Sequence, residues 1–171
     1  MEHKGTITMY SLLKEEWRKQ KDSLQVNFYD KIEDKLLKFA VIISKHKGKW
    51  VFCKHKERDT YEIPGGRRES GETIFETAKR ELREETGALD FCIVPICVYS
   101  VIGKTRVNQT GEESYGMLYF ADIRSFEKEL HSEIECVSFF EELPTEWTYP
   151  EIQPLLIKEY FKRMERAKKF T

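Results

Sequence analysis

Three glutamates near the middle of the chain have a spacing that can support metal chemistry. Glu81, Glu84 and Glu85 stand at positions i, i+3 and i+4, so on an α-helix their carboxylates share one face with Cβ atoms roughly 5–6 Å apart. Like charges that close repel unless a cation lies between them. Mg²⁺ and Mn²⁺ prefer oxygen ligands, and Mg²⁺ commonly bridges carboxylates to substrate phosphates. The spacing indicates a divalent-cation site, and the alternative is a solvated helix with i,i+4 ion pairs.

The residues around these glutamates predict the helix that would position them. Thr73 and Glu76 have the spacing of a capping box, and Gly87 is a typical C-terminal stop. We therefore expect a helix from Thr73 to about residue 85. An apolar stripe on its opposite side can dock it on a sheet and leave the acidic face toward a cleft. That stripe consists of Ile74, Ala78 and Leu82.

A glycine-rich segment precedes the helix. We interpret Pro64-Gly65-Gly66 as a turn, because glycine permits tight backbone geometry and close approach. Such a turn would bring backbone next to whatever the carboxylates hold, and the Gly66 carbonyl can join a set of hard oxygen ligands.

The segment 66–88 resembles the signature of the Nudix hydrolases, G-x5-E-x7-R-E-U-x-E-E-x-G-U, in which U is apolar. The residues that fill it in register are Gly66, Glu72, Arg80, Glu81, Leu82, Glu84, Glu85 and Gly87. Ala88, in the last apolar place, is smaller than usual. The resemblance extends to the lead-in 61–64 and to the segment 132–144, which is similar to the family's closing strand.

The resemblance implies roles for individual residues. The implied ligands of Mg²⁺ or Mn²⁺ are the Gly66 carbonyl and the carboxylates of Glu81, Glu84 and Glu85. Arg80 would orient these carboxylates by ion pairing, and Glu72 would brace the loop. The cations would neutralise diphosphate oxygens and lower the pKa of a bound water while a carboxylate takes its proton. Glu81 is the first choice for that base.

Residues outside the signature supply further candidates. Some family members draw a base or metal ligand from a glutamate elsewhere, and Glu133 ranks first here, with a solvated loop carboxylate as the alternative. The other candidates are Glu129, Glu112 and Glu113. Basic residues flank the glycines and are either phosphate clamps or plain surface charge; they are Arg58, Arg67 and Lys56.

The rest of the chain supplies the elements that must carry this site. Apolar, β-branched or alternating runs predict strands at residues 24–29, 36–44, 49–53, 60–63, 91–102, 115–123 and 136–140. A hairpin connection of three to five residues is expected at 45–48. A final helix is expected to begin near Pro150, with one apolar face formed by Ile152, Leu155, Leu156 and Phe161. The fold class is α/β or α+β, and the resemblance implies the Nudix α/β/α sandwich with a central mixed sheet over residues 36–169.

Composition bounds the organisation and the partners. The 171 residues suit one domain at 24–171 after an N-terminal arm or short helix at 1–23. A net charge of −1 argues against a dedicated nucleic-acid or membrane binder. Without a long apolar run we expect a cytoplasmic protein. The four cysteines are expected to be buried free thiols. Whether the chain forms a homodimer is left open.

The function implied is metal-dependent pyrophosphohydrolysis of a nucleotide. The chain looks most similar to MutT-like enzymes that convert a (deoxy)nucleoside triphosphate, including oxidised guanine nucleotides, to monophosphate and pyrophosphate. ADP-ribose, nucleotide sugars, dinucleoside polyphosphates and RNA 5′ ends remain alternatives, as does a non-catalytic nucleotide sensor. If the strands 91–102 and 115–123 lie beside the acidic helix, the polar loop 103–114 reaches over the cleft, where Asn108 or Gln109 could pair with a base edge; the alternative is a loop without contacts.

Overall fold

The computed structural model describes residues 24–128 and 134–169. The strands are β1 (Gln25–Tyr29), β2 (Leu37–His46), β3 (Lys49–His55), β4 (Tyr61–Glu62), β5 (Gly65–Arg67), β6 (Ala88–Ile102), β7 (Ser114–Phe126) and β8 (Ile134–Phe140). The helices are the 3₁₀ turn η1 (Asp34–Leu36), α2 (Ile74–Thr86) and α3 (Gln153–Lys168). The arm or short helix expected at residues 1–23 lies outside the described residues and stays a prediction.

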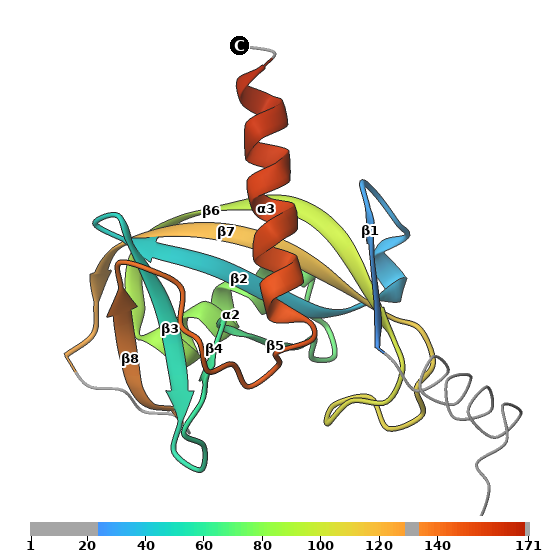
Figure 1. Ribbon diagram of the computed structural model, residues 1–171, viewed down its shortest axis with the longest axis horizontal. Helices are drawn as coiled ribbons and strands as arrows, with labels where there is room; N and C mark the ends of the chain where they lie inside the picture. The colour runs from blue at the N-terminus through green and yellow to red at the C-terminus, as the bar shows by residue number, and fades with distance from the viewer. Residues whose placement is uncertain (1–23, 129–133, 170–171) are drawn as a thin grey trace, which may run out of the picture.

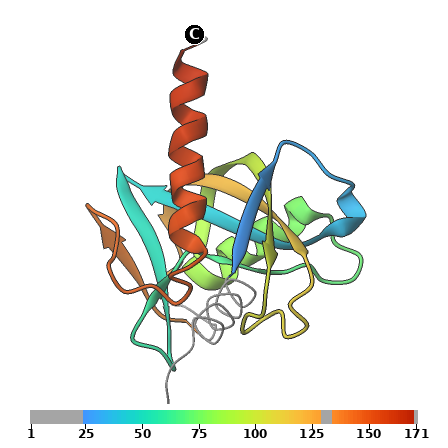
Figure 2. The same cartoon turned by 45° about the vertical axis from the view of Figure 1, so that its right-hand side comes forward.

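The described strands form one mixed sheet. Its main path runs β1-β6-β7-β2-β3-β4, with β5 paired to β2 and β8 paired to β3. β2 and β7 are parallel, and the other paired strands are antiparallel. Helix α3 crosses one face of the sheet and α2 lies behind it (Figure 1), an arrangement that the turned view repeats (Figure 2). The α/β/α sandwich with a central mixed sheet is therefore confirmed.

Each helix seals its own face of the sheet with an apolar cluster. On one face, Ala78 and Leu82 of α2 are fully buried against residues such as Ile42 of β2. On the other face, Leu156 of α3 is fully buried with a second cluster that includes Phe52 of β3. Burial of the expected α2 stripe fixes the rotation of the helix about its axis, which turns Glu81 and Glu85 toward β5.

The segment interpreted as a glycine turn is a strand. Gly65 and Gly66 are extended and pair with β2, where Gly65 lies opposite Val41 and Gly66 opposite Ala40. The turn prediction was wrong because these glycines serve close packing. A Cβ at Gly65 would overlap the backbone carbonyl of Ala40, so only glycine lets β5 approach the central strand this closely.

The hairpin between β2 and β3 is tighter than expected. Strand β2 continues to His46, which pairs with Lys49, so only two residues form the connection. Lys47 and Gly48 both have positive φ angles, 49° and 83°, as a two-residue hairpin turn of the primed type requires.

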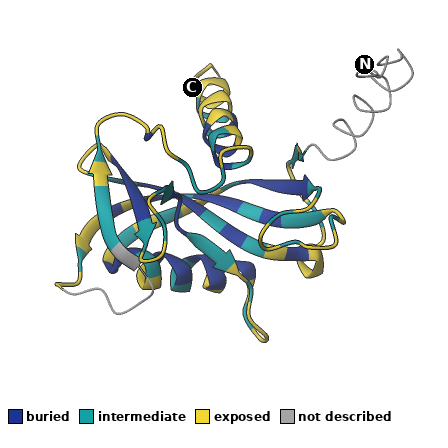
Figure 3. Cartoon of the chain, turned by 60° about the horizontal axis from the view of Figure 1, so that its bottom comes forward, coloured by how far each residue is buried: buried dark blue, intermediate teal, exposed yellow. Residues whose placement is uncertain are grey.

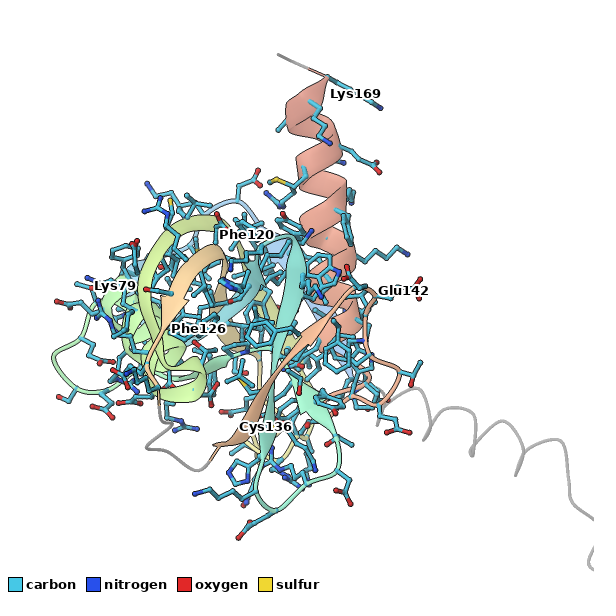
Figure 4. All side chains as sticks on the ribbon, turned by 90° about the vertical axis from the view of Figure 1, so that its left-hand side faces the viewer. Lys79, Phe120, Phe126, Cys136, Glu142 and Lys169 are labelled. Atoms are coloured by element: carbon cyan, nitrogen blue, oxygen red, sulfur yellow. The ribbon has the colours of Figure 1, made fainter. Side chains whose placement is uncertain are left out.

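Helix α3 begins later than expected, and only part of its expected apolar face is buried. It starts at Gln153, and Leu155 and Phe161 are exposed, whereas Leu156 and Ile157 face the sheet. The expected face was right for Ile152 and Leu156, which belong to the apolar cluster on this side of the sheet, and wrong for Leu155 and Phe161. Figure 3 shows the far end of α3 mostly exposed, and Figure 4 shows Lys169 there, away from the sheet.

The cysteines are partly as expected. Cys53 and Cys97 are buried free thiols, Cys136 is half-buried, and Cys92 is exposed. The expectation of burial was wrong for Cys92 because the first half of β6 carries outward-facing residues that neither helix covers. Over the described residues, no helix is both long and apolar enough to cross a membrane.

Candidate active site

The acidic helix is fixed at both ends by local interactions that the sequence predicts. At its start the Thr73 hydroxyl oxygen accepts from the Glu76 amide at 3.2 Å, and the Glu76 carboxylate accepts from the Thr73 amide at 2.8 Å. At its end Gly87 adopts a left-handed φ of 70°, and its amide donates to the Arg83 carbonyl at 2.8 Å. The capping box and the glycine stop are confirmed.

Arg80 is the centre of an ion-pair network on α2. Its guanidinium donates to Glu72 at 2.6 Å, to Glu81 at 2.7 Å and to Glu84 at 3.1 Å. It also donates to the backbone carbonyl of Arg67 on β5 at 3.0 Å. One cation thus links the helix to the loop before it and to β5, and the pairing raises the pKa of Arg80.

Glu72 closes the loop between β5 and α2. Besides Arg80, its carboxylate accepts from the Glu69 amide at 3.0 Å and from the Thr77 hydroxyl at 2.8 Å. The hydrogen bonds from Arg80 lower the pKa of Glu72 to about 2, with the Glu69 amide as the next cause. Glu72 is therefore ionised at any physiological pH and is committed to holding the loop.

Glu81 is buried against β5. A Cβ built at Gly66 would overlap the Glu81 carboxylate, so the absence of a side chain at Gly66 lets the carboxylate lie over the β5 backbone. Burial raises the pKa of Glu81, although the hydrogen bond from Arg80 opposes the shift. This carboxylate is held in place and is a better proton acceptor than an exposed one.

Glu85 lies on the same side of α2 and also meets β5. One carboxylate oxygen accepts from the Gly65 amide at 2.7 Å. Desolvation raises the pKa of Glu85 well above its usual value, and the nearby carboxylates of Glu81 and Glu62 add to the shift. An ionised Glu85 in this position is unfavourable unless a positive charge approaches it.

The chemistry of this donor set fits a divalent cation. All its side-chain donors are carboxylate oxygens, and the bare Gly66 backbone lies under Glu81, which suits Mg²⁺ or Mn²⁺. Across residues 24–128 and 134–169, no three His, Cys, Asp or Glu side chains already converge as metal ligands. Arg80 instead occupies oxygens of Glu81 and Glu84, so a cation would replace part of these contacts.

The close approach of Glu81 to β5 gives a first prediction. Gly66→Ala places a methyl group in the space that the carboxylate occupies, and displacement of a reacting group by about 1 Å can cost a factor of up to about 10² in rate. We expect kcat to fall at least roughly tenfold with the fold intact. Ser70→Ala, at an exposed residue of the loop after β5, is the control. Equal activity of the two variants would contradict the packing described here.

A cavity of about 400 Å³ lies at the start of α3 and reaches β5, the strand that Glu81 and Glu85 of α2 contact. Its floor includes Gly65 and Gly66, and Arg67 stands at its edge. Apolar and aromatic side chains from several elements form most of its wall; they are Phe39, Val41, Ile63, Tyr99, Val101, Val107, Tyr149, Ile152 and Leu156. The size and the apolar wall are those of a small-molecule site.

The loop between β6 and β7 borders this cavity, as the sequence predicts for residues 103–114. Thr105, Arg106 and Val107 line it, and the Arg67 guanidinium donates to the Val107 carbonyl at 3.2 Å. Asn108 instead donates to the Glu112 carbonyl at 2.6 Å. Its amide therefore shapes the loop, which makes it a poor candidate for reading a base.

The candidates outside the signature are dispersed. Arg58 donates to Glu62 at 2.9 Å, and Lys56 is exposed in the turn after β3 without lining the cavity. Glu113 accepts from the hydroxyls of Ser100 and Tyr29. Glu112 is exposed, and Glu129 and Glu133 lie outside the described residues. The role of each stays a prediction.

Two polar residues of the cavity wall were missed by reasoning from the sequence. Glu62 of β4 and Gln153 of α3 are both largely buried, at 7% and 5% exposure, and both line the cavity. The available signal was weak: Glu62 lies in a short, strand-like lead-in, and Gln153 follows a proline-containing turn. The hydrogen bond from the Ile63 amide to Gln153 at the start of α3 brings them to one cavity.

With this fold and site in place, comparison with known proteins assigns the chain to a family. Residues 34–160 match the model of the NUDIX domain. The chain belongs to the Nudix family and is a Nudix hydrolase, a pyrophosphohydrolase acting on phosphoric anhydride bonds.

Individual relatives share the family but differ in their named substrates. The chain is 35% identical over 124 residues, 72% of its length and 74% of the relative's, to the protein of Bacillus subtilis (strain 168) named "Putative 8-oxo-dGTP diphosphatase YtkD". The structure of the Bacillus subtilis pyrophosphohydrolase BsRppH is 29% identical with a TM-score of 0.66, covering 81% of this chain and 90% of that one. The NUDIX domain of Shewanella oneidensis NrtR, solved with ADP ribose, is 15% identical with a TM-score of 0.55, covering 75% of this chain and 88% of that one. This match supports the fold alone.

Proposed function

We propose that the chain is a metal-dependent nucleotide pyrophosphohydrolase that converts a (deoxy)nucleoside triphosphate to its monophosphate and pyrophosphate. The observation that carries this proposal is that the buried glutamate and the cavity meet at the same residue. The buried Glu81 carboxylate lies over Gly66, and Gly66 also lines the apolar cavity. A nucleotide with its base in the cavity would present its phosphates to the acidic side of α2.

The residues that would hold the cation are the Gly66 carbonyl, Glu81, Glu84 and Glu85. Mg²⁺ or Mn²⁺ bound there supplies charge neutralisation for the phosphate oxygens and acidifies a bound water. Glu85 supports this assignment because its raised pKa marks a carboxylate whose ionised form lacks a compensating charge.

The protein's own groups supply orientation and proton transfer. Arg80 holds the Glu81 and Glu84 carboxylates on one side of α2, while Glu72 fixes the preceding loop. We assign Glu81 as the general base, since burial shifts its pKa toward the range in which a carboxylate accepts a proton efficiently. Arg67, which lines the cavity, would contact a phosphate through its guanidinium.

The assignment of a nucleoside triphosphate as substrate rests on the size of the cavity and on the similarity to a relative with a named substrate. A single cavity of about 400 Å³ suits one base and its sugar, and the relative YtkD carries the name of an 8-oxo-dGTP diphosphatase. The similarity to BsRppH makes an RNA 5′ end the second candidate. A longer RNA would have to extend beyond this cavity.

A substrate panel tests the proposal. Nucleoside triphosphates, 8-oxo-dGTP, ADP-ribose, sugar nucleotides and a 5′-triphosphorylated RNA are incubated with the protein and Mg²⁺, and the products are separated. We expect a nucleoside triphosphate to have the highest kcat/KM and to release pyrophosphate. Release of orthophosphate alone, or a higher kcat/KM for ADP-ribose or RNA, would overturn the substrate assignment.

The loop between β6 and β7 gives a further prediction. Replacing residues 107–110 by a Gly/Ser segment removes the side chain of Val107 from the cavity wall and the Asn108 contacts that shape the loop. We expect the ratios of kcat/KM among nucleotide substrates to change while metal dependence persists. If every kcat/KM is unchanged or falls by one common factor, the loop does not contribute to base selection.

A further inference from the structure

The wall of the cavity is mostly apolar. Two of its few polar groups are buried side chains from segments that are far apart in the sequence. Glu62 lies on β4, and Gln153 is the first residue of α3. The two segments are joined by a hydrogen bond, because the backbone amide of Ile63, next to Glu62, donates to the Gln153 side-chain oxygen at 2.9 Å. Polar groups buried in an apolar wall need partners, and a bound ligand can supply them.

The orientation of the Gln153 amide follows from this contact. The Ile63 N–H can only donate, so the oxygen of Gln153 must face it and the NH₂ group must face the other way. Within the described residues, no hydrogen bond of that NH₂ group is found. Every buried side-chain nitrogen or oxygen among these residues has a hydrogen-bond partner, so the NH₂ nitrogen is not a buried atom. The NH₂ group is therefore open to the cavity, where it is a free donor.

Glu62 presents the opposite character. Arg58 donates to its Oε2 at 2.9 Å, in an ion pair whose side chains are 21% and 10% exposed. This contact orients the carboxylate and leaves Oε1 without a hydrogen bond among the described residues. An ionised carboxylate only accepts, at about four lone-pair positions. The cavity thus holds a fixed acceptor group and a fixed donor group.

The edges of the nucleobases differ in how they match these two groups. On its Watson–Crick edge guanine carries two adjacent donors, N1–H and N2–H₂, followed by the acceptor O6. Adenine and cytosine each place a ring-nitrogen acceptor beside one amino donor, and that acceptor would face the carboxylate. Uracil and thymine offer one N–H between two carbonyl oxygens. Only guanine gives a carboxylate two neighbouring donors and leaves an acceptor for an amide NH₂.

We propose that Glu62 and Gln153 are specificity-determining residues that read the Watson–Crick edge of guanine, with Glu62 accepting from N1–H and N2–H₂ and Gln153 donating to O6. Arg58 acts as a positioning residue that holds Glu62. This edge is the same in guanine and 8-oxoguanine, so the pair selects the base whatever its state at C8. The inference rests on the proposed function for the placement of the nucleotide.

Binding of nucleoside monophosphates tests the inference without requiring turnover. Affinities of GMP, IMP and AMP are measured by isothermal titration calorimetry with Mg²⁺ present, for the wild type and for Glu62→Gln. Hypoxanthine, the base of IMP, differs from guanine only by the missing N2 amino group. The wild type should bind GMP roughly tenfold more tightly than IMP, as expected for one hydrogen bond to a charged group. Glu62→Gln should bring that ratio close to one.

A second variant separates the two contacts. Gln153→Glu keeps an oxygen acceptor for the Ile63 amide but replaces the NH₂ donor by a carboxylate oxygen. The variant should bind GMP and IMP more weakly than the wild type by a similar factor of about ten or more, because both bases carry O6. The ratio of the two affinities should stay unchanged. Glu57→Gln, at an exposed carboxylate in the turn after β3, is the charge-matched control. Its affinities for GMP and IMP should equal those of the wild type.

The outcomes distinguish this inference from the proposed function. Equal affinity of the wild type for GMP and IMP, or an unchanged ratio in Glu62→Gln, overturns the reading of guanine even if the enzyme hydrolyses nucleotides. Loss of guanine selectivity in the variant supports it even if the triphosphate is not the substrate hydrolysed.

Discussion

Hydrolysis stops when divalent cations are removed with excess EDTA and returns when Mg²⁺ is added beyond the chelator. Glu81, Glu84 and Glu85 share one side of α2, and within residues 24–128 and 134–169 Arg80 forms the ion pairs with Glu81 and Glu84. A polyphosphate cannot approach these carboxylates without cationic neutralisation. The expected loss is complete to within the detection limit of a pyrophosphate-release assay. Undiminished turnover in EDTA, with carry-over metal ruled out, would contradict the assigned site.

Glu85→Gln is the substitution with the largest expected effect on rate. The variant keeps an oxygen acceptor for the Gly65 amide but removes the charge of a proposed metal ligand. We expect kcat to fall by a factor of about 10² or more, the scale of losing one electrostatic catalytic group. Glu165→Gln, at an exposed carboxylate of α3, is the control and should retain full activity.

The same variant should be more stable than the wild type when no metal is present. The pKa of Glu85 is raised in the folded protein, so its carboxyl favours folding at low pH and opposes folding once the pH rises above its unfolded pKa. At neutral pH the glutamine removes that opposition. We expect the Tm without metal to rise by a few degrees, since about 1 kcal/mol corresponds to about 2–4 °C in a chain of this size. A lower Tm together with lower activity would indicate structural damage.

Much of the site could be predicted because its determinants are local. The capping box at Thr73 and Glu76, the glycine stop at Gly87 and the buried Ala78 and Leu82 all lie within one helix and its borders. Their periodicity in the sequence is the periodicity of the structure. The helix and the side on which the glutamates lie therefore followed from spacing alone.

The parts that could not be predicted depend on contacts between distant segments. The glycines of β5 look like a turn until β2 is placed beside them, where Gly65 packs on the backbone of Ala40. The hydrogen bond between Ile63 and Gln153 joins residues 90 positions apart. The ring of Phe161 on α3 meets the ring of Trp50 on β3, far away in the sequence, and still stays exposed. None of these relations has a periodicity that the sequence displays.

The central claim is that the acidic side of α2 performs cation-dependent hydrolysis of a phosphoric anhydride. Its most direct test measures pyrophosphate release from a nucleoside triphosphate by wild type and Glu85→Gln side by side, while Mg²⁺ is titrated from excess EDTA upward. The account predicts no release by either protein in EDTA, saturable activity of the wild type with Mg²⁺, and at most about one hundredth of that kcat for the variant. Equal, cation-independent rates for the two proteins would contradict it.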